Sequence, residues 1–186
     1  DVNQIIGCNR INPAAAGNPN SISFTTQTGD INFCTDLNTS QTGNAGPITV
    51  NANGGAVDLM NNNVIASSTN GDGGNVNLSG STGVSNGGNI NTSAPNGNAG
   101  SISLNGGTGD ITVLDINATS NTGSGGTFTA TAGNGAINTG SIDVSSTNGQ
   151  GGGVNTNSQD LTIAGAVNAN GGTNGGTHRC DADQPG

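Results

Sequence analysis

The sequence predicts an all-β protein, a single-stranded parallel β-solenoid (parallel β-helix) of about seven coils, with about 26 residues and three short strands in each coil. The first observation is the composition: 107 of the 186 residues are Gly, Asn, Thr or Ser, and 7% are charged, against roughly 25% in an ordinary globular domain. The second is a glycine that recurs at intervals of 26 residues, once of 28. The third is a set of apolar residues at fixed distances from this glycine, which a disordered linker of the same composition does not predict.

The first strand of each coil is expected five residues after the repeating glycine. These glycines are Gly17, Gly43, Gly71, Gly97, Gly123, Gly149 and Gly175. The residues five positions later form the predicted core column, which comprises Ile22, Ile48, Val76, Ile102, Phe128 and Val154, with Cys180 continuing it. The inward residues two positions further on are Phe24, Val50, Leu78, Leu104, Ala130, Thr156 and Ala182. Polar residues lie between and beside the two columns, and this alternation is typical of a strand with one buried face.

Two further strands are expected in each coil. A second glycine, twelve residues after the first, marks a turn into a strand whose apolar residues are Ile31, Val57, Ile111, Ile137 and, in a shifted register, Val84 and Ile163. A third apolar group comprises Ile90, Ile116, Ile142 and Val167. Because stacked coils place equal offsets about 4.8 Å apart, small apolar residues suffice to form continuous ladders, and Gly and Asn supply the corners.

The same frame divides the chain into three parts. Residues 1–16 are an N-terminal partial coil or cap, residues 17–174 are six coils, and residues 175–186 are a C-terminal partial coil and assembly end. The C-terminal partial coil ends at nearly the same repeat position at which the N-terminal partial coil begins. Neither contains the pattern of an amphipathic helix that would cover an open sheet edge, so the sequence favours head-to-tail association into a filament. An excerpt of a longer repeat protein is the alternative. The residues expected at the joint are Ile5, Ile6, Cys8, Arg10, His178, Arg179, Cys180 and Ala182.

The three cysteines carry separate predictions. Cys8 and Cys34 lie 26 residues apart, at the same offset in adjacent coils, and a coil spacing of about 4.8 Å suits a disulfide, so we expect a Cys8–Cys34 bridge and an oxidising compartment. Two buried free thiols are the alternative. Cys180 falls in the column of Phe128 and Val154, where it is either a buried small apolar residue or a free thiol available for an intermolecular link, with burial slightly favoured.

The charges exclude several partners. All eleven acidic residues are Asp, there is no Lys, and the two Arg are Arg10 and Arg179, so the chain cannot neutralise a run of phosphates. Nucleic acid and anionic membrane surfaces are therefore not expected as partners. No stretch approaches the roughly 18 consecutive apolar residues of a membrane-spanning helix, so membrane insertion is not expected either, and residues 1–20 show no signal-peptide pattern.

No catalytic residue, metal ligand or cofactor is predicted. The chain has one His, His178, and no paired cysteine motif, so a metal site is not indicated. A Cys–His hydrolase built on His178 and Cys180 is rejected because neighbours on an extended strand are expected to point to opposite faces. Asp30 and Asp110 share an offset but lie three repeats apart, roughly 14 Å at the coil spacing, which is too far for a glycosidase pair. The sequence therefore predicts a protein that is not an enzyme.

The repeats also resemble a known family. The unit that begins at Gly97, GNAGSISLNGGTGDITVLDINATSNT, and the units that begin at Gly71 and Gly123 are similar to the repeats of bacterial filamentous-haemagglutinin-type secreted proteins, especially the Gly/Asn/Ser-rich ones common in cyanobacteria. The resemblance covers Gly17 to about Gly176 and implies a right-handed parallel β-helix, export to the cell surface, and a role in adhesion, aggregation or matrix formation. It implies no catalytic residues.

Together these observations predict a structural subunit of an extracellular filament, whose partner is a second copy of itself and which builds a cell-surface or matrix fibre. An adhesin stalk that binds surface polysaccharide is an alternative. So is an ice-binding solenoid, because Thr127, Thr129 and Thr131 present three outward threonines in one coil. The same outward offsets hold mixed Ser, Asn and Thr in the other coils, which disfavours ice binding.

Overall fold

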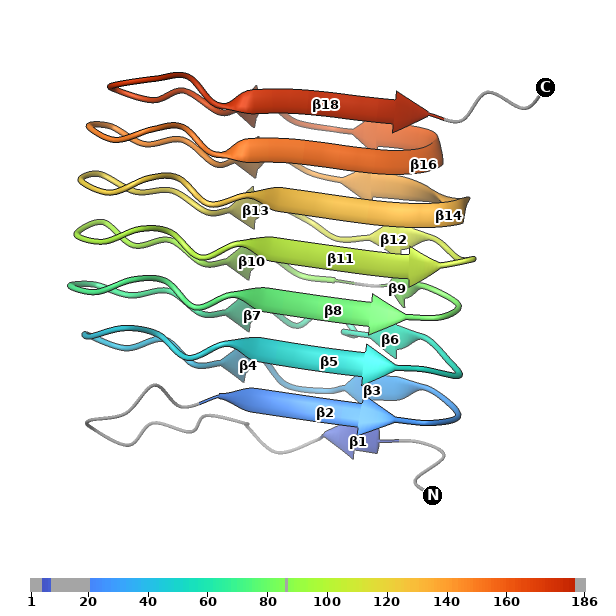
Figure 1. Ribbon diagram of the computed structural model, residues 1–186. Helices are drawn as coiled ribbons and strands as arrows, with labels where there is room; N and C mark the ends of the chain where they lie inside the picture. Colours follow the sequence, from blue (N-terminus) through green and yellow to red (C-terminus); the bar gives the residue numbers. More distant parts are fainter. Residues whose placement is uncertain (1–4, 8–20, 86, 183–186) are drawn as a thin grey trace.

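A computed structural model gives the structure of residues 5–7, 21–85 and 87–182. The described residues contain no helix and form a parallel β-solenoid of about six turns, which rises right-handed from the N-terminal to the C-terminal end (Figure 1). The predicted fold class is confirmed. Of the predicted N-terminal partial coil, residues 5–7 are described and the rest lies outside the described segments.

Each coil contributes one strand to each of three faces, which we call the first, second and third face. The first face comprises β2 (Ile22–Thr26), β5 (Ile48–Ala52), β8 (Val76–Gly80), β11 (Ile102–Gly107), the first parts of β14 (Phe128–Thr139) and β16 (Gly153–Ile163), and β18 (Thr177–Ala182). The second face comprises β1 (Ile5–Gly7), β3 (Ile31–Phe33), β6 (Val57–Asp58), β9 (Val84–Ser85), β12 (Ile111–Thr112) and the second parts of β14 and β16. The third face comprises β4 (Leu37–Asn38), β7 (Val64–Ile65), β10 (Ile90–Asn91), β13 (Ile116–Asn117), β15 (Ile142–Asp143) and β17 (Val167–Asn168).

The core is a set of apolar columns that run along the solenoid axis. The six described residues of the predicted first column pair in register and are at most 4% exposed: Ile22, Ile48, Val76, Ile102, Phe128 and Val154. The outward residues between them are polar, so every first-face strand up to β16 has one buried and one solvated side. Stacking in register lets each backbone pair with the coils on either side, and narrow columns of Ile, Val, Leu and Ala fill the interior.

The structure corrects three details of the predicted registers. In the second face, Ile137 pairs with Leu161, whereas Ile163 pairs with Thr139. The third face begins with Leu37 and then Val64, two buried residues that the glycine frame does not identify because the corner before them is longer than in the coils of Ile116 and Ile142. Leu37 follows Ile31 by six residues and Val64 follows Val57 by seven, whereas Ile116 follows Ile111 by five.

In the first face, His178 rather than Cys180 continues the column of Val154. Cys180 pairs instead with Thr156, in the column that was assigned to Ala182. The reason is a shorter corner in β16: Ala132 and Ala136 pair with Ser158 and Asp160, so the chain crosses from the first to the second face with two fewer residues than in β14. A frame of constant length therefore misplaces the last strand by two positions.

Side chains of Asn and Asp link successive coils at one corner. The Oδ1 atom of Asp36 accepts a hydrogen bond from the backbone N–H of Asn63 at 2.7 Å. In the same way, Oδ1 of Asn63 accepts from the N–H of Asn89 at 2.9 Å, and Oδ1 of Asn89 accepts from the N–H of Asp115 at 3.2 Å. Asp115 ends this ladder by accepting both the backbone N–H and the hydroxyl of Ser141, at 2.7 and 2.9 Å. These bonds satisfy amides that the turn leaves without a strand partner.

Asp115 gives this ladder a pH dependence. The two hydrogen bonds from Ser141, that from its backbone first, hold the pKa of the Asp115 carboxyl below its usual value. Since the folded pKa is depressed, the contribution to stability is present above the unfolded-state pKa and is lost as the pH falls through the folded pKa. We expect Asp115→Asn, which keeps an oxygen acceptor as in Asn63 and Asn89, to lose less stability than the wild type when urea unfolding is compared at about pH 5 and about pH 2. Equal losses in the two proteins would contradict this assignment.

Candidate functional site

The C-terminal end of the solenoid leaves strand edges uncovered. Among the described strands, β18 pairs only with β16, β17 pairs only with β15, and the second part of β16 pairs only with β14. Each of these strands lies at the top of its face in Figure 1. An uncovered edge of a parallel sheet presents backbone N–H and C=O groups that a further strand can pair with.

The backbone pattern identifies which groups are presented. The amides of Ile22, Ile48, Val76 and Ile102 each donate to a carbonyl of the following coil, at 2.8–3.0 Å. His178 occupies the same column one coil beyond Val154, so its N–H is directed at the uncovered edge. In a parallel ladder the residue two positions on is directed to the same side, so Cys180 presents its N–H there as well.

The apolar columns also end uncovered. Leu161 and Val167 are only partly buried, whereas the residues directly below them, Ile137 and Ile142, are 0% exposed. At this end, the second and third faces therefore expose apolar side chains in column positions that a following coil buries elsewhere in the solenoid. Burial of such apolar surface is the main stabilising contribution between stacked repeats.

The inward side of β18 carries the His and the free cysteine. His178 and Cys180 are two residues apart, so their side chains point to the same side of the strand, and the Nε2 atom of His178 lies 3.0 Å from the Sγ atom of Cys180. Both residues are exposed, and Cys180 is a free thiol. The expectation that these two side chains point apart was wrong, because alternation separates adjacent residues and not residues at i and i+2. The slight preference for a buried Cys180 in the column of Val154 was also wrong.

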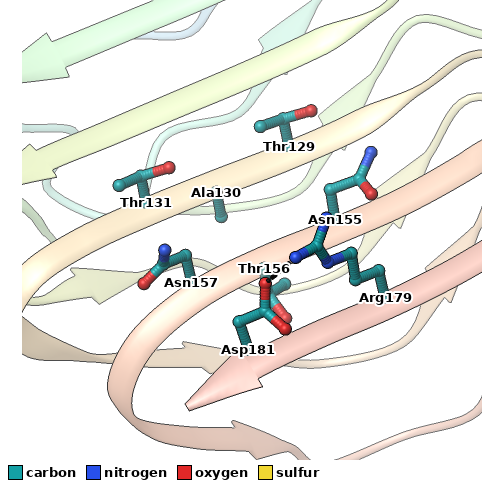
Figure 2. A pocket seen from close by; sticks show the side chains of 8 residues that line it. All are labelled: Thr129, Ala130, Thr131, Asn155, Thr156, Asn157, Arg179 and Asp181. Carbon is teal, nitrogen blue, oxygen red and sulfur yellow. Dashed lines mark ion pairs between the residues drawn. The ribbon is translucent and has the colours of Figure 1, made fainter. Parts of the chain in front are cut away.

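The outward side of β18 borders a shallow hollow on the first face. The Nη2 atom of Arg179 lies 2.7 Å from the Oδ2 atom of Asp181, and the two side chains are 74% and 47% exposed. Figure 2 shows this pair beside Asn155 and Asn157 of β16, with Thr129 and Thr131 of β14 on the far side of the hollow. The hollow encloses about 430 Å³. A second hollow of about 420 Å³ lies at the neighbouring glycine-rich corner and shares Asn155 with it.

The remaining predicted joint residues lie at the other end of the chain. Ile5 and Ile6 belong to β1, which pairs with β3 through Ile5↔Ile31 and Ile6↔Asn32. Cys8 and Arg10 lie outside the described residues, and Ala182 is the last residue of β18. The Cys8–Cys34 bridge stays a prediction. The register of β1 with β3 ends at Gly7↔Phe33, the pair that immediately precedes Cys8 and Cys34.

Acidic side chains are absent from most of the first face. The strands β2, β5, β8 and β11 and the first parts of β14 and β16 contain no charged residue, and β18 carries Arg179 and Asp181 as a pair. The other described aspartates lie on the second and third faces and at the corners: Asp30, Asp36, Asp58, Asp72, Asp110, Asp115, Asp143 and Asp160. In a chain with a net charge of −9, one face is thus polar and nearly uncharged.

The described segments contain no cluster of three or more His, Cys or acidic side chains that could hold a metal ion. They also contain no helix long and apolar enough to cross a membrane. No model of a protein family matches this chain, and searches of curated proteins and of solved structures likewise give no match.

Proposed function

We propose that this protein is a structural subunit of an extracellular filament, built by head-to-tail stacking of solenoids. The observation that carries the proposal is the uncovered C-terminal coil, which presents strand edges on all three faces and partly exposed apolar columns on the second and third faces. A further coil with the same 26-residue pattern would satisfy the backbone groups and bury the column ends, and a second copy of this chain presents such a coil.

The two ends match in phase. The described first face holds seven strands, from β2 to β18, and the second face also holds seven, from β1 to the second part of β16. Because the numbers are equal, a second copy stacked on the C-terminal end brings its β2 over β18 and its β1 over the second part of β16 at the same time. The third face holds six described strands, so the β4 of the second copy then lies two coil spacings from β17. The inward columns continue across this joint, with Ile22 over His178 and Phe24 over Cys180. Phe24 is half-buried in the single chain and contacts Phe33 edge-on, with the ring centroids 5.5 Å apart.

The extracellular location and the disulfide belong to the same proposal. The repeats resemble those of secreted filamentous-haemagglutinin-type proteins, and a Cys8–Cys34 bridge requires an oxidising compartment. The register of β1 with β3 supports this bridge, because continuing it by one residue places position 8 opposite position 34. A disulfide here would staple β1 to the solenoid and so hold one side of the joint in place.

A proline at position 180 tests the assembly. The amides of Arg179 and Asp181 are on the side of β18 that faces β16, whereas that of Cys180 faces the uncovered edge, so Cys180→Pro removes a donor that only a further coil uses. We expect this variant to fold, and to associate end to end at least tenfold more weakly than the wild type, which corresponds to about 1.4 kcal/mol. Sedimentation velocity over a concentration series measures the association, with the 17.8 kDa single chain as the reference species.

Cys180→Ala is the matched control, because it removes the thiol and keeps the amide. It is expected to assemble like the wild type in the presence and absence of a reducing agent. If the wild type stays a single chain at every concentration, or if the proline variant assembles as well as the alanine variant, stacking through this edge is wrong.

A further inference from the structure

The first face has properties that end-to-end stacking does not use. Over six successive coils its outward side chains are uncharged, and they are Ser, Thr and Asn at nearly all positions. Each of these side chains both donates and accepts hydrogen bonds. We propose that this face binds a neutral, extended, β-linked polysaccharide that lies along the solenoid axis. This inference does not depend on filament assembly.

The charge distribution selects the class of ligand. Apart from Asp181, the described aspartates lie on the other faces and corners, so the first face neither attracts a cationic ligand nor offers cations to an acidic polysaccharide. Its only charged side chains, Arg179 and Asp181, neutralise each other at 2.7 Å. A ligand rich in hydroxyl groups and without charge matches such a surface.

The geometry selects an extended chain. Parallel stacking repeats the outward side chains about every 4.8 Å along the axis, which is close to the length of one sugar residue in an extended β-linked glycan. Ser103, Thr129 and Asn155 lie directly above one another in register, so that successive coils offer hydrogen-bonding groups to successive sugars. A compact ligand would contact one coil only.

The hollow at β18 is a recess on this surface, next to the second hollow at the glycine-rich corner. It is bordered by Asn155, Asn157 and the Arg179–Asp181 pair, and it has a volume of about 430 Å³. No phenylalanine ring points outward in the described part of this face: Phe128 is buried, and Phe24 packs inward on Phe33. Affinity must therefore come from many weak hydrogen bonds in series, so it should rise steeply with the length of the glycan.

The test compares binding of two matched variants to microcrystalline cellulose and to cello-oligosaccharides of two to six sugars. Thr129→Asp places a carboxylate at the centre of the first face, whereas Thr112→Asp places one on the outward side of β12 in the second face. We expect the wild type and Thr112→Asp to bind cellulose and cellohexaose, Thr129→Asp to bind at least tenfold more weakly, and cellobiose and alginate to bind to none of them. Thermal unfolding checks that both variants are folded.

The proposal is overturned by absence of cellulose binding in the wild type, by equal losses in the two variants, or by affinity that does not depend on glycan length. Inhibition of ice recrystallisation that Thr129→Asp abolishes, without glycan binding, would assign the face to ice instead. Repeating the measurements with Cys180→Pro separates the two proposals, because glycan binding to a single solenoid should persist when assembly fails.

Discussion

Replacing Phe128 by alanine is expected to destabilise the protein by about 3–5 kcal/mol. Phe128 is 0% exposed and lies between Ile102 and Val154 in the first column of the first face. Its ring is one of the largest fully buried side chains, and a cavity there removes contacts to the coils on both sides. Urea unfolding followed by circular dichroism measures the loss.

The matched control is the next residue along the strand. Thr129→Ala truncates an outward side chain and should change the free energy of unfolding by less than about 0.5 kcal/mol. Because solenoid coils are stabilised mainly by their neighbours, the loss in Phe128→Ala should be concentrated near the cavity, and hydrogen exchange should accelerate in β11 and β16, which flank β14, before β2 and β5. A loss below about 1 kcal/mol, or uniform acceleration along the rod, would contradict this account of the core.

Gly126→Ala is expected to destabilise by about 3 kcal/mol, although alanine is usually harmless in a strand or turn. A Cβ atom on Gly126 would collide with the carbonyl oxygen of Gly100 in the coil below and would lie 2.9 Å from the Cβ of Ala118. The neighbouring coils repeat the arrangement, since Gly100 faces the carbonyl of Gly74 and Gly152 faces that of Gly126. To make room for the added methyl group, the two coils would have to move apart. All the other columns of stacked residues oppose this movement, because they hold the two coils at their present spacing.

Gly43→Ala is the control for this substitution. A Cβ on Gly43 meets no atom within 4 Å, so we expect a change of less than about 0.5 kcal/mol in the same urea experiment. Similar losses in the two variants would contradict the assignment to the close approach of stacked coils, because alanine restricts the unfolded chain and this effect alone stabilises a protein.

The periodicity identified most of the solenoid because its columns are local repeats of one pattern. Ile48, Val76 and Ile102 lie at equal distances from a glycine, and the structure stacks them in register. Prediction failed where the repeat length changes. The short corner at Ser158 moved Cys180 by two positions, and the longer corners before the third face hid Leu37 and Val64. A turn can lose or gain residues without disturbing the strands that it joins, so a fixed frame accumulates an error at each such turn.

The candidate sites were accessible from the sequence to different degrees. The proximity of His178 and Cys180 follows from strand alternation alone, and applying the i, i+2 rule would have found it. The uncharged first face can be read from the outward offsets of each coil once the strands are in register. The hydrogen bond from Ser141 to the Asp115 carboxylate could be identified only from the structure, because a side chain at a turn can bond within its own turn or to the next coil.

Electron microscopy of the purified protein at neutral pH tests the central claim most directly. Head-to-tail stacking of seven coils at about 4.8 Å predicts long unbranched fibres with an axial repeat of about 34 Å, and predicts that Cys180→Pro does not form them. Short rods of uniform length at all concentrations, or fibres whose strands run along the fibre axis, would contradict it.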